Sequence, residues 1–414
     1  METTTCLIAG GGPAGIMLGL LLARAGIMVT VLEKHADFLR DFRGDTVHAS
    51  TVQLLDELGL GNAFRKLPQT RLQNFQLPLP NGDTLLLGDF NKLKPPYDYV
   101  AMIPQWDFLN FLVEAARREP SFSIRMNTEV IDLFKSGERF AGVRYRERNG
   151  HEGAIAADLI VACDGRHSLV RTKAGLVPRE FKVPFDTWWF RLPRHADEMG
   201  EVAALVPQIR GRDILLTFTR ETFYQLAYFN EKGADAMLRA EGIERFKQRI
   251  AALRPDFADR LDTLKSMDDL HMLDVKLNRL NTWHVDGVLC IGDAAHAMSP
   301  AGGVGINLAI QDAVAAAARL AGPLRNRTVT SDDLASVRER RWMPTVFIQA
   351  SQRILHRVLF VPVFEGRRSG PPPWALWAAR YIPGFTALPA RMIAFGPRPE
   401  HAPAFARRPQ SEPQ

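Results

Sequence analysis

The chain has few cysteines and no long apolar run. Its three cysteines, Cys6, Cys163 and Cys290, have neither the paired spacing of a disulfide framework nor the spacing of metal ligands. Each lies in an apolar stretch, so we interpret them as small core residues in a reducing compartment. No apolar run reaches the roughly 20 residues of a membrane-spanning helix, and the N-terminus lacks a charged-then-apolar secretory pattern. We therefore expect a cytoplasmic protein without a metal site.

The C-terminal end lacks lysine and is poor in acidic residues. Residues 338–414 hold 12 arginines and four glutamates, a balance of +8, so the net charge of +6 leaves −2 for the remainder. Arginine beside tryptophan and phenylalanine suits a membrane surface or an anionic substrate, but we favour a helical cap over the first domain, with a solvated face. The basic residues form no recognisable nucleic-acid module, so we expect no nucleic-acid partner.

A glycine-rich turn near the N-terminus predicts a dinucleotide site. Residues 10–15 fit the Gly-x-Gly-x-x-Gly fingerprint, and they stand between an apolar strand over 7–9 and a helix over 14–25. Such glycines let backbone N–H groups approach a pyrophosphate, and the helix N-terminus adds partial positive charge. A turn without a ligand is the alternative. The predicted cofactor-binding residues of this turn are Gly10, Gly12, Pro13, Ala14 and Gly15.

An acidic residue follows the second apolar strand. This strand, over 29–32, leads into Glu33, 18 residues after Gly15. That distance is close to the offset of about 20 residues at which an acidic side chain binds the adenosine ribose. Glu33 therefore predicts an AMP half with an unphosphorylated ribose. The turn alone does not separate FAD from NAD, because both present ADP to it.

Two later motifs resemble signatures of one flavoenzyme family. Residues 160–171, Ile-Val-Ala-Cys-Asp-Gly-Arg-His-Ser-Leu-Val-Arg, resemble the Asp-Gly signature of the class A flavoprotein monooxygenases, the group that contains 4-hydroxybenzoate hydroxylase. Residues 289–307, from Leu-Cys-Ile-Gly-Asp-Ala-Ala-His to Gly-Val-Gly-Ile-Asn, resemble its Gly-Asp signature and its Pro-x-x-Gly-x-Gly-x-Asn extension. The resemblance covers residues 1–350 and implies that the dinucleotide is FAD.

The same resemblance implies individual FAD contacts. Asp293 accepts hydrogen bonds from the ribityl hydroxyls, with a helix cap as the alternative, and the turn over 300–305 enters a helix whose N-terminus stabilises reduced flavin. Arg43 reaches the flavin and Gln105 lies beside the ribityl chain, unless both are solvated surface residues. The implied cofactor-binding residues are Glu33, Arg43, Gln105, Val130, Asp164, Gly165, Asp293, Pro300, Gly303, Gly305, Ile306 and Asn307.

Strand patterns between the motifs predict an inserted domain. Strand-like runs over 213–219 and 222–229 fall between the second and third motifs. We predict an α/β fold with a Rossmann-like FAD-binding domain, an inserted β-sheet substrate domain and a helical C-terminal segment. The FAD-binding domain takes residues 1–72, 99–178 and 271–349, the substrate domain 73–98 and 179–270, a helical cap 350–400 and a flexible tail 401–414.

The resemblance also implies the reaction. NADPH or NADH reduces FAD, the reduced flavin adds dioxygen, and a flavin hydroperoxide hydroxylates an aromatic or related lipophilic substrate. The nicotinamide cofactor docks transiently, because no second glycine fingerprint follows a strand. The protein positions these groups and excludes water. We expect a monomer or homodimer, and the substrate stays open because pocket residues vary within the family.

Oxygen transfer to a phenolate requires a group that accepts or relays a proton. His48 is the predicted catalytic residue, since its unperturbed pKa is ~6.5; a plain histidine at a helix entry is the alternative. Trp188, Phe190 and Tyr224 are the predicted substrate residues. Successive side chains of a strand point to opposite faces, and a sheet core explains these aromatic residues equally well.

Three other functions share parts of this pattern. A flavin-dependent halogenase has the same first fingerprint, and residues 188–193 approach its Trp-x-Trp-x-Ile-Pro signature, but Phe190 and Leu192 depart from it. A flavin-dependent dehydrogenase without oxygen insertion and a non-catalytic flavin-binding protein are the others. Substrate-dependent oxygen consumption separates the monooxygenase from these two, and a halide requirement marks a halogenase.

Overall fold

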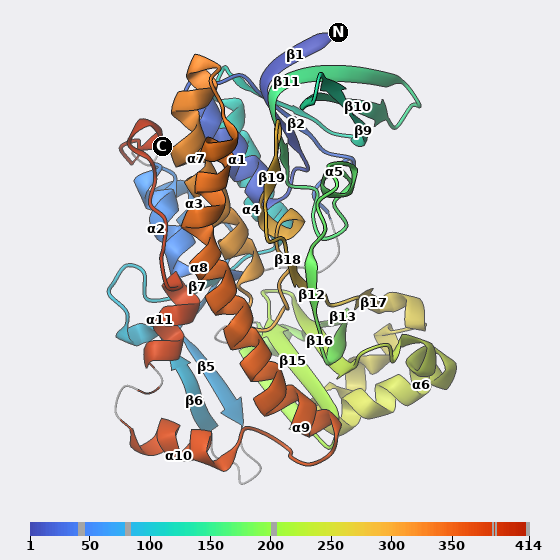
Figure 1. Ribbon diagram of the computed structural model, residues 1–414. Helices are drawn as coiled ribbons and strands as arrows, with labels where there is room; N and C mark the ends of the chain where they lie inside the picture. The colour runs from blue at the N-terminus through green and yellow to red at the C-terminus, as the bar shows by residue number, and fades with distance from the viewer. Residues whose placement is uncertain (40–45, 79–83, 200–204, 383–384, 386, 411–414) are drawn as a thin grey trace.

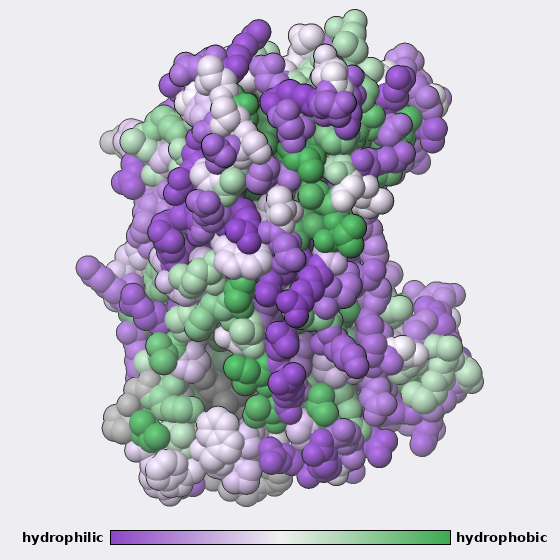
Figure 2. All heavy atoms as spheres, viewed as in Figure 1, coloured by the Kyte–Doolittle hydropathy of each residue, from purple (hydrophilic) through white to green (hydrophobic). Residues whose placement is uncertain are grey.

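A computed structural model gives the structure over residues 1–39, 46–78, 84–199, 205–382, 385 and 387–410. Figure 1 shows an upper and a lower part, with helix α8 running obliquely from the left of the upper part to the middle of the lower part. Figure 2 shows the same face, where hydrophilic residues predominate and hydrophobic residues gather at the lower left, around α10 and α11. Over the described ranges, no helix is both long and apolar enough to cross a membrane.

A largely parallel sheet forms the upper part, in the order β19-β20-β11-β1-β2-β8. Strand β19 runs antiparallel to β20, and β9 and β10 extend antiparallel from β11. The second half of β1, residues 6–9, is buried because structure covers both faces of a central parallel strand. The strands are β1 (Glu2–Ala9), β2 (Val29–Leu32), β8 (Phe122–Arg125), β9 (Thr128–Ser136), β10 (Arg139–Glu147), β11 (Glu152–Ala162), β19 (His284–Val285) and β20 (Val288–Cys290).

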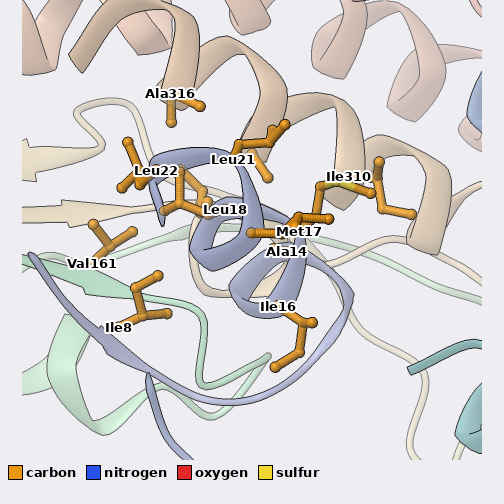
Figure 3. Packing of buried hydrophobic residues seen from close by; sticks show 14 of the residues in the cluster. Ile8, Ala14, Ile16, Met17, Leu18, Leu21, Leu22, Val161, Ile310 and Ala316 are labelled. Atoms are coloured by element: carbon orange, nitrogen blue, oxygen red, sulfur yellow. The ribbon is translucent and has the colours of Figure 1, made fainter. Parts of the chain in front are cut away.

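Helix α1 (Pro13–Arg24) lies between this sheet and helix α7 (Gly305–Asn326). Proline at the first helical position and an uninterrupted apolar sequence explain why α1 forms and why it is buried on all sides. Figure 3 shows its side chains between Ile8 and Val161 of the sheet and Ile310 and Ala316 of α7. The other helices of this part are α2 (Ala49–Glu57), α3 (Gly61–Arg65), α4 (Gln105–Arg117), α5 (Leu169–Lys173) and α8 (Ser331–Leu355).

An antiparallel sheet forms the lower part, in the order β14-β15-β16-β13-β17. Strand β13 carries two adjacent tryptophans on opposite faces. Trp188 packs with Phe246 of helix α6 (Asp235–Leu253), whereas Trp189 belongs to a separate hydrophobic cluster on the other face. The strands are β13 (Phe185–Pro193), β14 (Leu205–Arg210), β15 (Asp213–Thr219), β16 (Phe223–Glu231) and β17 (His271–Leu273).

Short elements connect the two sheets. The hairpin of β5 and β6 is a separate two-stranded sheet that packs beside β14, so the segment that begins at residue 73 lies against the lower sheet. The remaining strands are β3 (Thr46–Val47), β4 (Thr70–Leu72), β5 (Asn74–Pro78), β6 (Thr84–Asp89), β7 (Val100–Met102), β12 (Arg179–Phe181) and β18 (Leu277–Arg279). The short helical turns include η1 (Phe90–Lys92), η2 (Ala196–Glu198), η3 (Pro255–Thr263), η4 (Met267–Asp269), η5 (Gly292–Ala294), η6 (His356–Phe360) and η7 (Ala404–Ala406).

The segment after residue 350 is helical and covers the face of the lower sheet opposite α6. Phe360 stacks on Phe185 of β13 with ring centroids 4.5 Å apart, and Ala390 and Ala394 are fully buried in the same cluster. Small residues at these two positions let α11 approach the sheet side closely. The helices are α9 (Val361–Phe364), α10 (Pro373–Tyr381) and α11 (Ala387–Phe395).

The structure differs from the expected flexible tail over residues 401–410. Ala402 and Ala406 are 3% and 0% exposed in the core cluster around α1. Arg24 of α1 donates to the carbonyl oxygen of Ala406 at 2.8 Å, and the Ala402 N–H donates to the Glu57 carboxylate at 2.7 Å. Proline and arginine content suggested fraying, but these contacts with small side chains and backbone groups hold the segment on the upper part.

Candidate active site

The glycine-rich turn between β1 and α1 is closed on one side and open on the other. Gly10 has φ +102°, and a Cβ there would lie 2.5 Å from the carbonyl oxygen of Cys163. A Cβ at Gly15 would lie 2.0 Å from the carbonyl oxygen of Gly10. A Cβ at Gly12 would meet only the Cys163 oxygen, at 4.0 Å. The turn therefore packs tightly against the end of β11 and leaves space in front of Gly12.

Helix α1 presents backbone N–H groups at this open side. Pro13 is its first residue and Gly12 caps it without a side chain. The N–H groups of Ala14 and Gly15 lie in the first turn, where a helix provides no acceptor. Together with the helix dipole they attract an anion such as a pyrophosphate. The residues predicted at 10–15 are thus brought together in the arrangement that a dinucleotide requires.

The carboxylate of Glu33 lies at the end of β2, beside the turn. Glu33 is 2% exposed, and it accepts hydrogen bonds from the N–H of Gly11 at 2.8 Å and from the N–H of His35 at 3.0 Å. Strand β9 begins next to it, because the Thr128 N–H donates to the Glu33 carbonyl at 2.9 Å. Val130 is two residues further along β9. Glu33 and Val130, predicted on the AMP half, therefore belong to neighbouring strand ends.

Asp164 follows β11 and has one carboxylate oxygen without a partner among the described residues. One oxygen accepts from the Val170 N–H at 3.1 Å, while the other is buried and makes no hydrogen bond with the described residues. Burial raises the pKa of Asp164, although its hydrogen bonds oppose this. The next residue, Gly165, has φ +85° and open space around it. A buried orphan oxygen beside open space fits a ligand hydroxyl.

Asp293 lies in a turn whose backbone is held by the buried carboxylate of Asp312. Asp312 of α7 is fully buried and accepts from the Gly292 N–H at 3.1 Å and from the His296 imidazole at 2.6 Å. Arg341 of α8 donates to its other oxygen at 3.0 Å. Burial raises the pKa of Asp312, but His296 and Arg341 outweigh this and hold the pKa below its usual value. These contacts set the direction of the Gly292–Asp293 backbone.

The Asp293 side chain is left available by this arrangement. It is half-buried, and none of the described residues hydrogen-bonds with it. It lies in the short turn η5, whose N-cap makes no side-chain hydrogen bond, and it caps neither η5 nor α7. The helix-cap alternative therefore does not account for Asp293. Its carboxylate stays available close to the end of β20, next to the edge strand of the sheet.

The loop from Pro300 leads into the N-terminus of α7. Gly303 has φ +62° and donates its N–H to the Pro300 carbonyl at 3.0 Å. The N–H groups of Gly305, Ile306 and Asn307 lie in the first helical turn and have no acceptor within the helix. This end of α7 can therefore stabilise negative charge on a bound group through its backbone.

The side chain of Asn307 braces this helix end rather than standing free. It is 6% exposed. Its oxygen accepts from the His48 N–H and the Thr51 hydroxyl, both at 2.8 Å, and its nitrogen donates to the Thr46 carbonyl at 3.2 Å. Asn307 thus ties α7 to β3 and α2. The FAD contact that the resemblance implies for Asn307 can be made by its backbone N–H.

The structure says less about two other predicted FAD contacts, Gln105 and Arg43. Gln105 is the first residue of α4, half-buried, and its side chain makes no hydrogen bond with the described part of the chain. That leaves its amide available at the start of the helix. Arg43 lies outside the described residues. Both assignments remain predictions from the resemblance.

His48 is buried at the start of α2 and has a fixed tautomer. Its Nδ1 lies 2.6 Å from the carbonyl oxygen of Ile393 in α11. A carbonyl only accepts, so Nδ1 carries the proton and Nε2 keeps its lone pair. Burial lowers the pKa of His48 to about 4, despite an opposing effect of the Ile393 hydrogen bond. The ring is therefore neutral near pH 7 and can accept a proton at Nε2.

A cavity adjoins this histidine. Its walls come from α2, α7, α8 and the end of α11, and they combine apolar and polar side chains. The lining residues include His48, Asn307, Leu308, Gln311, Met392 and Ile393. The C-terminal segment therefore contributes directly to the surroundings of His48. The sequence offered no signal for this, since residues 48 and 393 are remote in the chain.

The three predicted substrate residues are not brought to this region. Trp188, Phe190 and Tyr224 are 0%, 0% and 6% exposed in the cluster beneath α6. This is the sheet-core alternative considered for them. Successive side chains of a strand point to opposite faces. The residues next to these three in the strands therefore point to the other face of the sheet.

The opposite face of the sheet carries a tryptophan that was not among the three selected substrate residues. Trp189 is 8% exposed and shares a hydrophobic cluster with Phe218, Ala301 and Ile393. Its indole N–H is buried and has no partner among the described residues. Ala301 directly follows Pro300 in the loop before α7. A buried, unpaired donor on this face is a candidate contact for a polar atom of a substrate.

Comparison with known proteins identifies the family. Residues 2–350 match the family model described as FAD binding domain. The chain belongs to this family. It is 35% identical to a 6-methylpretetramide 4-monooxygenase of Streptomyces rimosus over 344 residues, which is 82% of this chain and 80% of that protein. It is 26% identical to a para-nitrophenol 4-monooxygenase of Pseudomonas sp., with 80% and 81% covered.

Structural comparison gives the same fold and a wider range of chemistries. The chain resembles a solved flavin-dependent brominase with a TM-score of 0.76 at 15% identity, covering 96% of this chain and 95% of that one. At that identity the likeness shows the fold alone. The predicted α/β fold, the FAD cofactor and the class of FAD-dependent aromatic monooxygenase are confirmed by the family and the sequence relatives.

Proposed function

We propose that this FAD-dependent monooxygenase hydroxylates a phenolic, polycyclic aromatic compound. The substrate would belong to the same chemical class as the 6-methylpretetramide in the name of its 35% identical relative. The observation that carries this proposal is the apolar cluster of Trp189, Phe218, Ala227 and Ala301, which joins the lower sheet to the loop before α7. Aromatic rings at this junction of the two parts favour a flat aromatic ligand.

The chain's own residues supply the FAD site. The turn at Gly12 and the N-terminus of α1 receive the pyrophosphate, and Glu33 receives the adenosine ribose. The available oxygens of Asp164 and Asp293 receive ribityl hydroxyls, and the first N–H groups of α7 face the negative end of the reduced ring. FAD held there would supply the redox chemistry, with NADPH or NADH as the source of the hydride and dioxygen as the source of the oxygen atom.

Two side chains are assigned to the substrate. His48 accepts a phenolic proton at Nε2 while the Ile393 carbonyl holds its Nδ1–H. Burial lowers the pKa of His48 to about 4, so the ring is neutral near pH 7 and Nε2 keeps the lone pair that this role requires. Trp189 donates its unpaired indole N–H to a carbonyl or hydroxyl oxygen of the same compound.

The test is substrate-dependent oxygen consumption by the FAD-loaded enzyme with NADH or NADPH. We expect polycyclic phenols to accelerate it and to gain one atom from labelled dioxygen, while their methyl ethers, which lack the acidic proton, react far more slowly. Equal rates for phenols and methyl ethers would remove the role of His48. A requirement for bromide or chloride with halogenated product would assign the chain to the halogenases.

A further inference from the structure

Helix α10 (Pro373–Tyr381) has an outward face of aromatic and cationic side chains. Trp374, Trp377 and Tyr381 are 62%, 58% and 62% exposed, and Arg380 on the same side is also exposed. The Trp377 and Tyr381 rings lie 6.0 Å apart, and the Arg380 guanidinium is 5.8 Å from the Tyr381 ring. Ala378 is buried and marks the inner side. We call the four exposed residues the α10 aromatic face.

This face lies in a segment with positive charge only. Residues 366–399 contain five arginines, no lysine and no acidic residue, and Glu365, immediately before them, pairs with Arg367. Arg367 and Arg368, just before α10, are both exposed, and Leu388 of the neighbouring helix is 65% exposed. Figure 2 shows pale and hydrophobic residues gathered at the lower left, where α10 and α11 lie in Figure 1.

Exposed tryptophans beside exposed arginines mark a docking surface. The charge and the size of this face indicate which partner it binds. A second copy of this chain is disfavoured, because a symmetric interface would place the same arginines on both sides. A stable interface with a folded protein buries about 800 Å² per partner. A nine-residue helix is only about 14 Å long, so its outer face is too small to supply that area.

An anionic lipid surface meets both conditions. Tryptophan and tyrosine rings prefer the headgroup layer, where one side of the ring is apolar and the other wet. Arginines near the bilayer are attracted to anionic lipids. Binding of this kind needs only shallow insertion of a few rings and no large complementary area.

We propose that the α10 aromatic face docks the enzyme on an anionic membrane surface. Trp374, Trp377 and Tyr381 enter the headgroup layer, and Arg367, Arg368 and Arg380 contact lipid phosphates. Helices α10 and α11 both pack on β6, and α11 carries the Met392 and Ile393 side chains that line the His48 cavity. Docking therefore brings the cavity region close to the bilayer, from which a lipophilic substrate can be taken.

The experiment is vesicle flotation of the full-length, FAD-loaded enzyme. We expect binding to phosphatidylcholine vesicles that contain phosphatidylglycerol, little binding to phosphatidylcholine alone, and an affinity that falls as salt rises. The affinity of the double variant Trp374→Ala, Trp377→Ala for these vesicles should be lower by roughly tenfold or more. Arg367→Gln and Arg368→Gln should each weaken binding about fivefold. Quenching of tryptophan fluorescence by brominated phosphatidylglycerol should occur in the parent enzyme and drop in the double variant.

The matched control is Met28→Ala, at a residue 57% exposed on the upper part, between α1 and β2. It should bind vesicles like the parent enzyme, and both variants should keep their FAD content. Failure to bind anionic vesicles, or equal binding to vesicles of phosphatidylcholine alone, would overturn the proposal. A dimer in solution that the double variant dissociates, without vesicle binding, would assign the face to a second copy. Neither outcome touches the proposed hydroxylation, which is measured without lipid.

Discussion

The Nδ1 atom of His48 lies 2.6 Å from the backbone carbonyl oxygen of Ile393, a residue 345 positions later in the chain. His48 begins α2 and touches Asn307 at the N-terminus of α7, whereas Ile393 lies in α11. The family match ends at residue 350. A segment outside the shared family region therefore sets the tautomer of the proposed proton acceptor.

Replacement of His48 by asparagine separates its basic and structural roles. The asparagine amide can still donate to the Ile393 carbonyl but offers no basic nitrogen. We expect the hydroxylation rate with a phenolic substrate to fall about 10²-fold or more, with unchanged FAD content. Turnover and absorbance of bound flavin measure the two quantities. His284→Asn, on β19, is the control, and an equal loss of rate in both variants would contradict the role of His48.

The two adjacent tryptophans of β13 give a matched pair. Trp189→Phe removes an indole N–H that has no described protein partner, so the KM for substrate should rise several-fold while the melting temperature changes little. Trp188→Phe removes a hydrogen bond to Asp235 of 2.9 Å, which should cost about 1 kcal/mol of stability and leave KM unchanged. Steady-state kinetics and thermal unfolding of both variants test this. The reverse pattern would return the substrate site to the α6 face.

The sequence predicted what depends on local spacing and missed what depends on remote contacts. The turn at 10–15, Glu33 and Asp293 could be found because glycines and carboxylates stand at fixed distances from apolar strands. Trp188 was chosen over Trp189 because strand alternation leaves the inward face undecided, and a shift of one residue reverses every assignment. The burial of Ala402 and Ala406 was missed, since composition does not reveal contacts with the remote residues Arg24 and Glu57.

Asp293→Ala should weaken FAD binding. The change removes an acceptor from ribityl hydroxyls in a half-buried turn, and leaving such partners unsatisfied costs roughly 1–3 kcal/mol, or about tenfold or more in the dissociation constant. Fluorescence of released FAD on dilution measures it. Asp286→Ala, an exposed carboxylate beside β20, should leave affinity unchanged. An unchanged affinity for Asp293→Ala would make the late motif a structural turn only.

Stability should fall in mild acid through two buried histidines. Burial lowers the pKa of His48 and of His356 to about 4, while both titrate near ~6.5 in the unfolded chain. Above pH ~6.5 both histidines are neutral in the folded and in the unfolded chain. As the pH falls toward 4, only the unfolded chain takes up these protons, so the free energy of unfolding falls, by up to about 3 kcal/mol for His48. Urea unfolding at a series of pH values measures this. His356→Gln should flatten the dependence, and an identical slope in that variant would exclude its part.

Residues 401–410 should stabilise the upper part through their contacts, although composition suggested a frayed tail. Deletion of residues 401–414 removes the hydrogen bonds from Arg24 to Ala406 and from Ala402 to Glu57, and it uncovers apolar core beside α1. Each lost hydrogen bond is worth about 1 kcal/mol, and the uncovered surface adds to this, so we expect a melting temperature several degrees lower. Deletion of residues 411–414 alone keeps every one of these contacts and should change nothing. Scanning calorimetry of both proteins with FAD bound decides the matter: equal melting temperatures would mean that residues 401–410 rest on the surface without stabilising it.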